Sequence, residues 1–142
     1  DLTQNELTQI PTESLQNLTS LNTLILNHNK ISSINSNAFE GLSNLTTLNL
    51  GSNQIKSIPT EALANLVNIK EIQLDSNQIN SLTANDFPLL PKLQELNLAN
   101  NSLTKLDGSV FSNLTDLILL DLGTNQISSI SPNAFNGLES KK

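Results

Sequence analysis

Residues 45–68 read LTTLNLGSNQIKSIPTEALANLVN, and this stretch decides the fold because the chain repeats its pattern every 24 residues. A fixed period of this length is typical of a solenoid, in which each repeat packs only against its neighbours. We therefore expect one elongated domain over residues 1–142, with a partial repeat at 1–20. The full repeats are 21–44, 45–68, 69–92, 93–116 and 117–140, and they follow L-x-x-L-x-L-x-x-N-x-[IL]-x-x-[IL] from Leu21, Leu45, Ile69, Leu93 and Leu117.

Each repeat is expected to begin with a short strand. In the copy that opens at Leu21, Leu24 and Leu26 flank Ile25, and this alternation places the two leucines on one face of a strand. One coil cannot bury its own leucines, but a coil stacked on it every 24 residues can, and the strands then form one parallel sheet spaced by roughly 4.8 Å. Prolines among Ser, Thr and Asn in the return segment favour short helical turns and extended pieces there.

The asparagine at the ninth place of every copy is expected to hold the coils together. Its amide both donates and accepts hydrogen bonds, so it can pair backbone groups of the bend in its own coil and in the neighbouring coil. Leaving such groups unpaired would cost about 1 to 3 kcal/mol per coil. We interpret this ladder as structural rather than as a ligand site; it comprises Asn5, Asn29, Asn53, Asn77, Asn101 and Asn125.

A second regular position predicts a packed spine. It carries Leu15, Phe39, Leu63, Phe87, Phe111 and Phe135. An aromatic stripe at a structural period is typical of a core, and a cofactor box is the remote alternative.

Composition excludes most other chemistry. The net charge is −6, none of the seven basic residues is arginine, and the lysines form no cluster beyond the pair Lys141 and Lys142, so nucleic acid is not an expected partner. The absence of cysteine and a single histidine, His28, argue against metal sites and thiol chemistry, and no cofactor is expected. No run of 18 apolar residues and no leader is present, so neither membrane insertion nor a signal segment is expected.

Binding is expected on the strand residues that point away from the core, at the second, third, fifth, seventh and eighth places. Between copies 21–44 and 117–140, 13 of 24 places are identical, whereas all five of these places differ. This contrast indicates a varied recognition surface on a constant scaffold, or mere neutrality of exposed positions. The candidate ligand-binding residues are Thr23, Ile25, Asn27, Thr47, Asn49, Glu71, Gln73, Asp75, Glu95, Asn97, Leu119 and Asp121.

The acidic members of this set suggest a basic partner rather than catalysis. Glu71 and Glu95 share the third place of adjacent repeats, so they are expected to lie within roughly 5 Å of one another. A catalytic carboxylate pair needs a pocket and a positioned water, which a flat sheet does not supply. We therefore predict no enzymatic activity, and a mildly acidic face that favours a basic ligand.

The repeats resemble the typical 24-residue class of leucine-rich repeats, whose pattern continues after the last apolar place as P-x-x-x-F-x-x-L. The resemblance runs from about Leu2 to Leu138. It implies an α/β fold: a curved, right-handed solenoid with a parallel sheet on the concave face and an irregular or short-helical convex side. It also implies binding of proteins or glycans on the concave face and an extracellular location, since toll-like receptor ectodomains and variable lymphocyte receptors use this class, although a cytoplasmic location stays open.

Two departures from the family pattern concern the ends. Cysteine-rich caps are absent, and Lys141 stands where a sixth opening leucine belongs. We expect a piece of a larger array whose apolar ends give weak end-to-end self-association.

Two further functional interpretations stay open: a spacer whose acting parts lie elsewhere, and a consensus-like or engineered scaffold without a ligand. Whether the sequons at Asn17, Asn44, Asn100 and Asn113 carry glycans is also open, because chance predicts about as many in a chain so rich in Asn, Ser and Thr.

Overall fold

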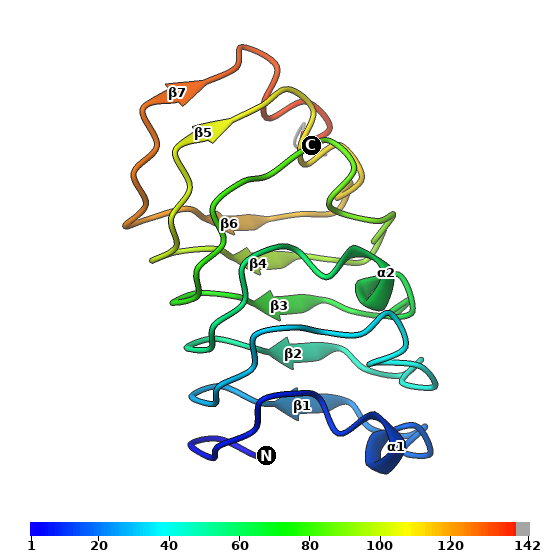
Figure 1. Ribbon diagram of the computed structural model, residues 1–142. Coiled ribbons are helices and arrows are strands. Elements are labelled where there is room, and N and C mark those ends of the chain that lie inside the picture. Colours follow the sequence, from blue (N-terminus) through cyan, green and yellow to red (C-terminus); the bar gives the residue numbers. More distant parts are fainter. Residues whose placement is uncertain (139–142) are drawn as a thin grey trace.

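The computed structural model describes residues 1–138 and shows a solenoid of stacked coils (Figure 1). We number the coils one to six, with coil one at 1–20 and coil six beginning at residue 117, and count places from the first leucine of the pattern. One side of the solenoid is a five-stranded parallel sheet in the order β1-β2-β3-β4-β6. These strands are β1 (Thr23–Ile25), β2 (Thr47–Asn49), β3 (Glu71–Gln73), β4 (Glu95–Asn97) and β6 (Leu119–Asp121).

The strand register follows the sequence period. Thr23 pairs with Thr47, Thr47 with Glu71, and Glu71 with Glu95, each step being one repeat. The central residue of each of the first four strands is buried, whereas its two neighbours are exposed or half-buried. The predicted curved sheet of short strands, with inward leucines, is therefore confirmed.

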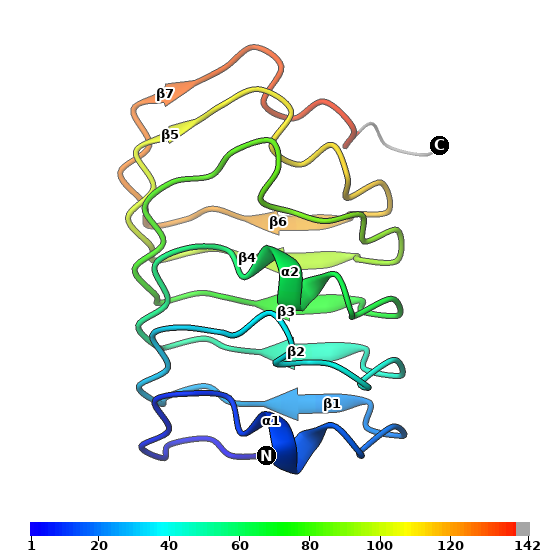
Figure 2. The ribbon, with the colours of Figure 1, turned by 45° about the vertical axis from the view of Figure 1, so that its right-hand side comes forward.

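The opposite side consists mainly of turns, with two short helices (Figure 2). These are α1 (Thr12–Leu15) and α2 (Thr60–Leu63), each preceded by a proline and each with a glutamate in its first turn. Proline fixes a backbone angle that suits the entry to a helix, and an acidic first turn favours the helix dipole. The prediction of short helical turns on this side is confirmed.

A second, two-stranded sheet on this side was not predicted. It pairs β5 (Lys105–Leu106) with β7 (Ser129–Ile130), and the Ser131 N–H donates to the Leu106 carbonyl at 2.9 Å. At the same place in coil three stands Pro59, which has no N–H, and in coil four the Thr83 N–H donates instead to the Asp86 carboxylate at 2.7 Å. Coils three and four therefore lack the free backbone donor that the β5–β7 pair uses at this place.

The core runs without interruption between the two sides. Inward residues of the interior coils, such as Leu26, Leu50 and Leu74, are fully buried. The spine is packed as predicted, with ring centroids of Phe87 and Phe111 5.9 Å apart and those of Phe111 and Phe135 6.1 Å apart. The spine weakens in coil six, where Phe135 is 44% exposed.

The asparagine ladder has the predicted structural role. Asn53 Nδ2 donates to the carbonyls of Leu26 at 3.1 Å, Leu50 at 3.1 Å and Gly51 at 3.2 Å, and its Oδ1 accepts from the Ile31 N–H at 3.0 Å. The same set of bonds recurs in the other coils through Asn29, Asn77, Asn101 and Asn125. Among residues 1–138, no buried side-chain nitrogen or oxygen lacks a partner.

Coil one departs from this pattern. Asn5 is exposed, and its Nδ2 donates only to the carbonyls of Leu2 and Thr3. The bonds of an interior ladder residue to a previous coil therefore have no counterpart among residues 1–138 at Asn5.

The residue before each ladder asparagine has a left-handed backbone. Its N–H points along the stack, as when His28 donates to the Gly51 carbonyl at 3.1 Å and Ser52 to the Asp75 carbonyl at 2.9 Å. The left-handed conformation directs this backbone N–H toward the next coil. The positions with φ between +51° and +57° are Gln4, His28, Ser52, Ser76, Asn100 and Thr124. His28 is thus an exposed turn residue.

Two remaining expectations concern membranes and the chain end. Over residues 1–138, no helix has the length and apolarity needed to cross a bilayer. Lys141, at the place of a sixth opening leucine, lies outside the described residues.

Candidate functional site

The outward face of the five-stranded sheet is the candidate site. Register brings the predicted residues into rows: the third-place row runs from Thr23 through Thr47, Glu71 and Glu95 to Leu119. None of the candidate residues is buried. The face is therefore open along the whole sheet.

Glu71 and Glu95 are register partners on β3 and β4, as the sequence predicted. Glu71 is half-buried and accepts a hydrogen bond from Gln73 Nε2 at 2.9 Å, whereas Glu95 is exposed. Like charges directly opposite one another across two strands are destabilising, so a cation placed between them gains energy. The pair thus forms an acidic spot on an open surface.

Asp75 extends this acidic surface toward β2. A Cβ atom added to Gly51 would lie 2.7 Å from Asp75 Oδ1, so the absence of a side chain at Gly51 makes room for the Asp75 carboxylate. Asp121 adds a further exposed carboxylate on β6. Among residues 1–138, no group of three or more His, Cys, Asp or Glu side chains is placed to hold a metal ion.

The side-chain oxygens at the fifth place are less available to a ligand than the sequence suggested, because three of them already accept a backbone hydrogen bond. Asn49 Oδ1 accepts from the Gly51 N–H at 2.9 Å, Asn97 Oδ1 from the Ala99 N–H at 3.0 Å, and Asp121 Oδ1 from the Gly123 N–H at 2.8 Å. An Asn or Asp two residues before a small residue is the signal of this turn, which sequence reasoning missed. What remains for a ligand at Asn49 and Asn97 is mainly the amide NH2 group.

The two ends of the sheet differ in character. On β1 and the bend after it, Thr23, Ile25 and Asn27 are exposed or half-buried, and Asn27 Oδ1 accepts from Thr3 Oγ1 at 2.8 Å. At β6, Leu119 is 54% exposed beside Ile118, which is 81% exposed. The β1 end of the face is therefore uncharged, whereas the β6 end combines exposed apolar side chains with the Asp121 carboxylate.

Sequence reasoning also missed a short second asparagine ladder, at the corner that leads into the sheet. Asn44 Nδ2 donates to the Thr19 carbonyl at 2.8 Å and Asn68 Nδ2 to the Ser43 carbonyl at 2.7 Å, while Lys92 Nζ donates to Asn68 Oδ1 at 2.6 Å. Asparagine at the last place of two successive repeats is the signal. These bonds fix the edge of the candidate face.

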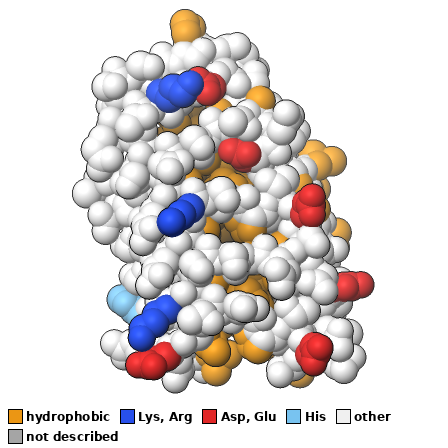
Figure 3. Space-filling model, in the orientation of Figure 1, with side chains coloured by type: hydrophobic (Ala, Val, Ile, Leu, Met, Phe, Trp, Pro, Cys, Tyr) orange, Lys and Arg blue, Asp and Glu red, His pale blue; other side chains and the backbone are white. Residues whose placement is uncertain are grey.

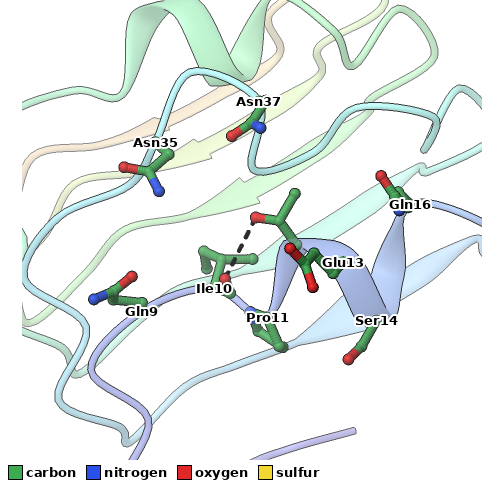
Figure 4. A pocket seen from close by; sticks show the side chains of 9 residues that line it. Gln9, Ile10, Pro11, Glu13, Ser14, Gln16, Asn35 and Asn37 are labelled. Atoms are coloured by element: carbon green, nitrogen blue, oxygen red, sulfur yellow. Dashed lines mark hydrogen bonds between the residues drawn. The ribbon is translucent and has the colours of Figure 1, made fainter.

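A hollow of about 820 Å³ lies on the other side of the molecule, between coils one and two (Figure 4). Its lining combines amide and hydroxyl side chains with one carboxylate: Gln9, Ile10, Pro11, Thr12, Glu13, Ser14, Gln16, Asn35 and Asn37. None of the predicted ligand-binding residues takes part in it. Figure 3 shows that, on the face viewed in Figure 1, charged side chains are few among uncharged polar ones, and some basic side chains lie beside acidic ones. Ion pairs join Lys30 to Glu6 at 3.7 Å and Lys105 to Asp107 at 3.2 Å.

The sequence over residues 8–142 matches the family described as "BspA type Leucine rich repeat region", with six copies of the repeat. No curated protein matches the chain.

Two solved structures show the same architecture. A chain in the crystal structure of the TLR13–ssRNA13 complex is similar with a TM-score of 0.90 and 32% identity, over 94% of this chain and 19% of that chain. A chain in the octameric complex of Latrophilin 3, Unc5D and FLRT2 is similar with a TM-score of 0.84 and 25% identity, over 95% of this chain and 40% of that chain. The 142 residues thus span less than half of either similar chain. The strand register, the asparagine ladder and the six matched copies together show that this chain belongs to the BspA-type leucine-rich repeat family.

Proposed function

We propose that the chain is a non-catalytic recognition module that binds a protein or glycan through the outward face of its five-stranded sheet. The observation that carries this proposal is the difference between the buried and the accessible residues of each coil. In coils two to five the ladder residue is always a buried Asn and the spine residue a buried Leu or Phe, whereas the candidate residues of the same coils are accessible and vary from strand to strand. A surface whose side chains differ from strand to strand on a rigid scaffold can contact a ligand specifically at several points.

The partner that fits this face best is a protein with a basic surface. Glu71, Glu95, Asp75 and Asp121 lie on three of the five strands and in the bends beside them, and the side chain of Lys70 is the nearest basic group in the sequence. Charge complementarity raises the rate of encounter and selects against acidic partners. The amide NH2 groups of Asn49 and Asn97 add donors for carbonyl or glycan oxygens.

The two similar structures support partner binding by such arrays, since both are complexes, one with protein chains and one with single-stranded RNA. For this chain we favour protein over RNA because the net charge is −6 and arginine is absent, which disfavours contact with phosphates. An extracellular location is part of the same proposal and rests on the family resemblance.

Binding of a labelled oligolysine peptide at low salt tests the proposal, with oligoglutamate and single-stranded RNA as comparison ligands. The variant Glu71→Gln/Glu95→Gln should weaken oligolysine binding by about three- to tenfold, because it removes two charges and keeps the side-chain shapes. Added salt should weaken the wild-type complex by screening.

The matched control is Glu13→Gln/Glu61→Gln, which removes two exposed carboxylates from α1 and α2. This variant should bind as the wild type does. Equal loss in both variants would show that net charge alone, and not the sheet face, attracts the peptide. A chain that binds neither peptides nor a panel of immobilised glycans would instead favour the spacer function.

A further inference from the structure

The hollow between coils one and two is lined mainly by polar side chains (Figure 4). Along residues 34–37 the side chains alternate: Asn35 and Asn37 line this hollow, whereas Ile34 and Ser36 line a smaller one of about 290 Å³ toward coil three. Coil one supplies the opposite wall. We call the space between coils one and two the amide hollow, because primary amides are frequent in its lining.

A side-chain bond found elsewhere in the solenoid is not made across the amide hollow. In coil three, Thr60 Oγ1 donates to the Asp86 carbonyl of coil four at 2.6 Å. Thr12 occupies the same place in coil one, but its Oγ1 donates only to the Ile10 carbonyl of its own coil, at 3.4 Å. The bond that joins coils three and four at this place therefore has no counterpart between coils one and two among residues 1–138.

Close backbone contacts flank the amide hollow on both sides. On one side, the Lys30 N–H donates at 2.8 Å to the carbonyl of Leu7, which lies two residues before Gln9. On the other side, Gly41 packs so closely on Gln16 that an added Cβ atom would clash with the Gln16 carbonyl. The separation of the two coils is therefore fixed by backbone contacts, so a ligand need not order the hollow when it binds.

The amide side chains of the hollow are available to a ligand. Within residues 1–138, the side chains of Gln9, Asn35 and Asn37 make no hydrogen bond. Each primary amide offers two N–H donors and an acceptor oxygen. Ile10, which is 7% exposed, and the half-buried Pro11 add apolar surface to the same lining. The hollow thus combines several free donors and acceptors with a small apolar floor.

A neutral sugar has the groups that this lining requires. Each of its hydroxyls donates and accepts hydrogen bonds, and the C–H groups of its rings form apolar faces. Of the described residues that line the hollow, none is basic and only Glu13 is acidic, so carboxylated or phosphorylated sugars fit less well. The volume of about 820 Å³ lies within the range of about 300 to 1,000 Å³ for small-molecule sites, which is enough for a short oligosaccharide.

We propose that the amide hollow binds a neutral oligosaccharide. The amide groups of Gln9, Asn35 and Asn37 bond to ring hydroxyls, Glu13 accepts from a further hydroxyl, and Ile10 contacts a C–H face. None of the lining residues belongs to the five-stranded sheet, so this site is separate from the outward face and does not depend on the function proposed above.

NMR titration of the 142-residue chain tests the proposal, with cellotriose, maltotriose and triacetylchitotriose as uncharged probes and trigalacturonate as an anionic one. At least one uncharged probe should shift the side-chain NH2 signals of Gln9, Asn35 and Asn37, with a Kd of about 1 mM because an open polar site binds weakly. The NH2 signals of Asn49 and Asn97 on the sheet face should not move. Trigalacturonate should bind at least about tenfold more weakly.

Asn35→Ala/Asn37→Ala removes two of the amides and should weaken binding of the same uncharged probe at least about tenfold. The matched control is Asn80→Ala/Asn85→Ala, which removes two exposed asparagines from coil four, where Asn85 occupies the place that Asn37 has in coil two. This control should bind the probe as the wild type does. Thermal unfolding checks that both variants keep the fold.

Three results would overturn the proposal. The uncharged probes could leave every signal unshifted even at about 10 mM. The shifts could appear at Asn49 and Asn97 instead, which would place the sugar on the sheet face. The two double variants could weaken binding equally, which would show that the hollow is not the site. The oligolysine measurements concern the sheet face alone, so the two proposals can fail separately.

Discussion

A single ladder asparagine joins two coils through four hydrogen bonds, and this explains why no apolar residue can replace it. Asn77 donates to the carbonyls of Leu50, Leu74 and Asp75, and accepts from the Ile55 N–H at 2.9 Å. Asparagine combines a donor and an acceptor on one short side chain, which the bend needs at this place.

Replacement of Asn77 by alanine should lower the free energy of unfolding by about 3 kcal/mol, because it leaves the buried Ile55 N–H and the bend carbonyls unpaired. Urea denaturation measures the change. The control is Asn5→Ala at the exposed end of the same ladder, where the loss should stay below about 1 kcal/mol. Equal losses at the two sites would contradict the structural role of the interior bonds.

The left-handed residue before each ladder asparagine offers a stabilising change. Ser52 has φ +52°, and the equivalent place in coil five already carries Asn100 at φ +54°. Asparagine tolerates this conformation better than serine does, so Ser52→Asn should raise the free energy of unfolding by roughly 0.5 to 1 kcal/mol. Ser57→Asn in the same coil, where φ is not positive, should leave it nearly unchanged. A destabilised Ser52→Asn protein would show that this backbone is not strained.

At the scale of elements, the short helices and the turns beside them depend on close contacts between coils. Gly41 has φ +83°, and a Cβ atom there would clash with the Gln16 carbonyl at the end of α1. The three atoms nearest to a Cβ atom at Gly108, by contrast, all belong to the side chain of Asn133, which is exposed. An added side chain would therefore meet backbone atoms at Gly41 and side-chain atoms at Gly108.

Gly41→Ala should destabilise the protein by about 3 kcal/mol, since both the backbone angle and the space oppose a side chain. Gly108→Ala should cost about 1 kcal/mol or less because Asn133 can adopt another rotamer. Thermal unfolding of the two variants compares them. The expectation fails if Gly108→Ala is the more damaging substitution.

At the scale of the whole molecule, an array in which each coil contacts only its neighbours has uneven stability. Interior coils have a partner on both sides, whereas coils one and six have one each among the described residues. Local opening should therefore begin at the ends and spread inward.

Amide hydrogen exchange should show this gradient directly. The Leu50 and Leu74 N–H groups, which bond to the next coil at 2.8 Å and 2.9 Å, should exchange at least about 100-fold more slowly than the Leu2 N–H. Uniform protection along the chain would mean that the solenoid unfolds as one cooperative unit.

The period of 24 residues alone determined the stacked coils, the strand register, the ladder and the spine, because each coil must bury its apolar residues on the next. Binary alternation likewise identified the buried central residues of the first four strands. These predictions are confirmed in the interior coils, whereas Asn5 and Phe135 are exposed. The identity of the ligand-binding residues stays a prediction.

The tertiary structure decided the features that depend on which polar atoms meet. The turns that engage the oxygens of Asn49, Asn97 and Asp121, the β5–β7 pair, and the corner ladder of Asn44 and Asn68 all arise from contacts between particular donors and acceptors. A repeat pattern places residues on a face, but a hydrogen bond also needs a free donor at the right distance. That condition is fixed only when neighbouring coils are packed together.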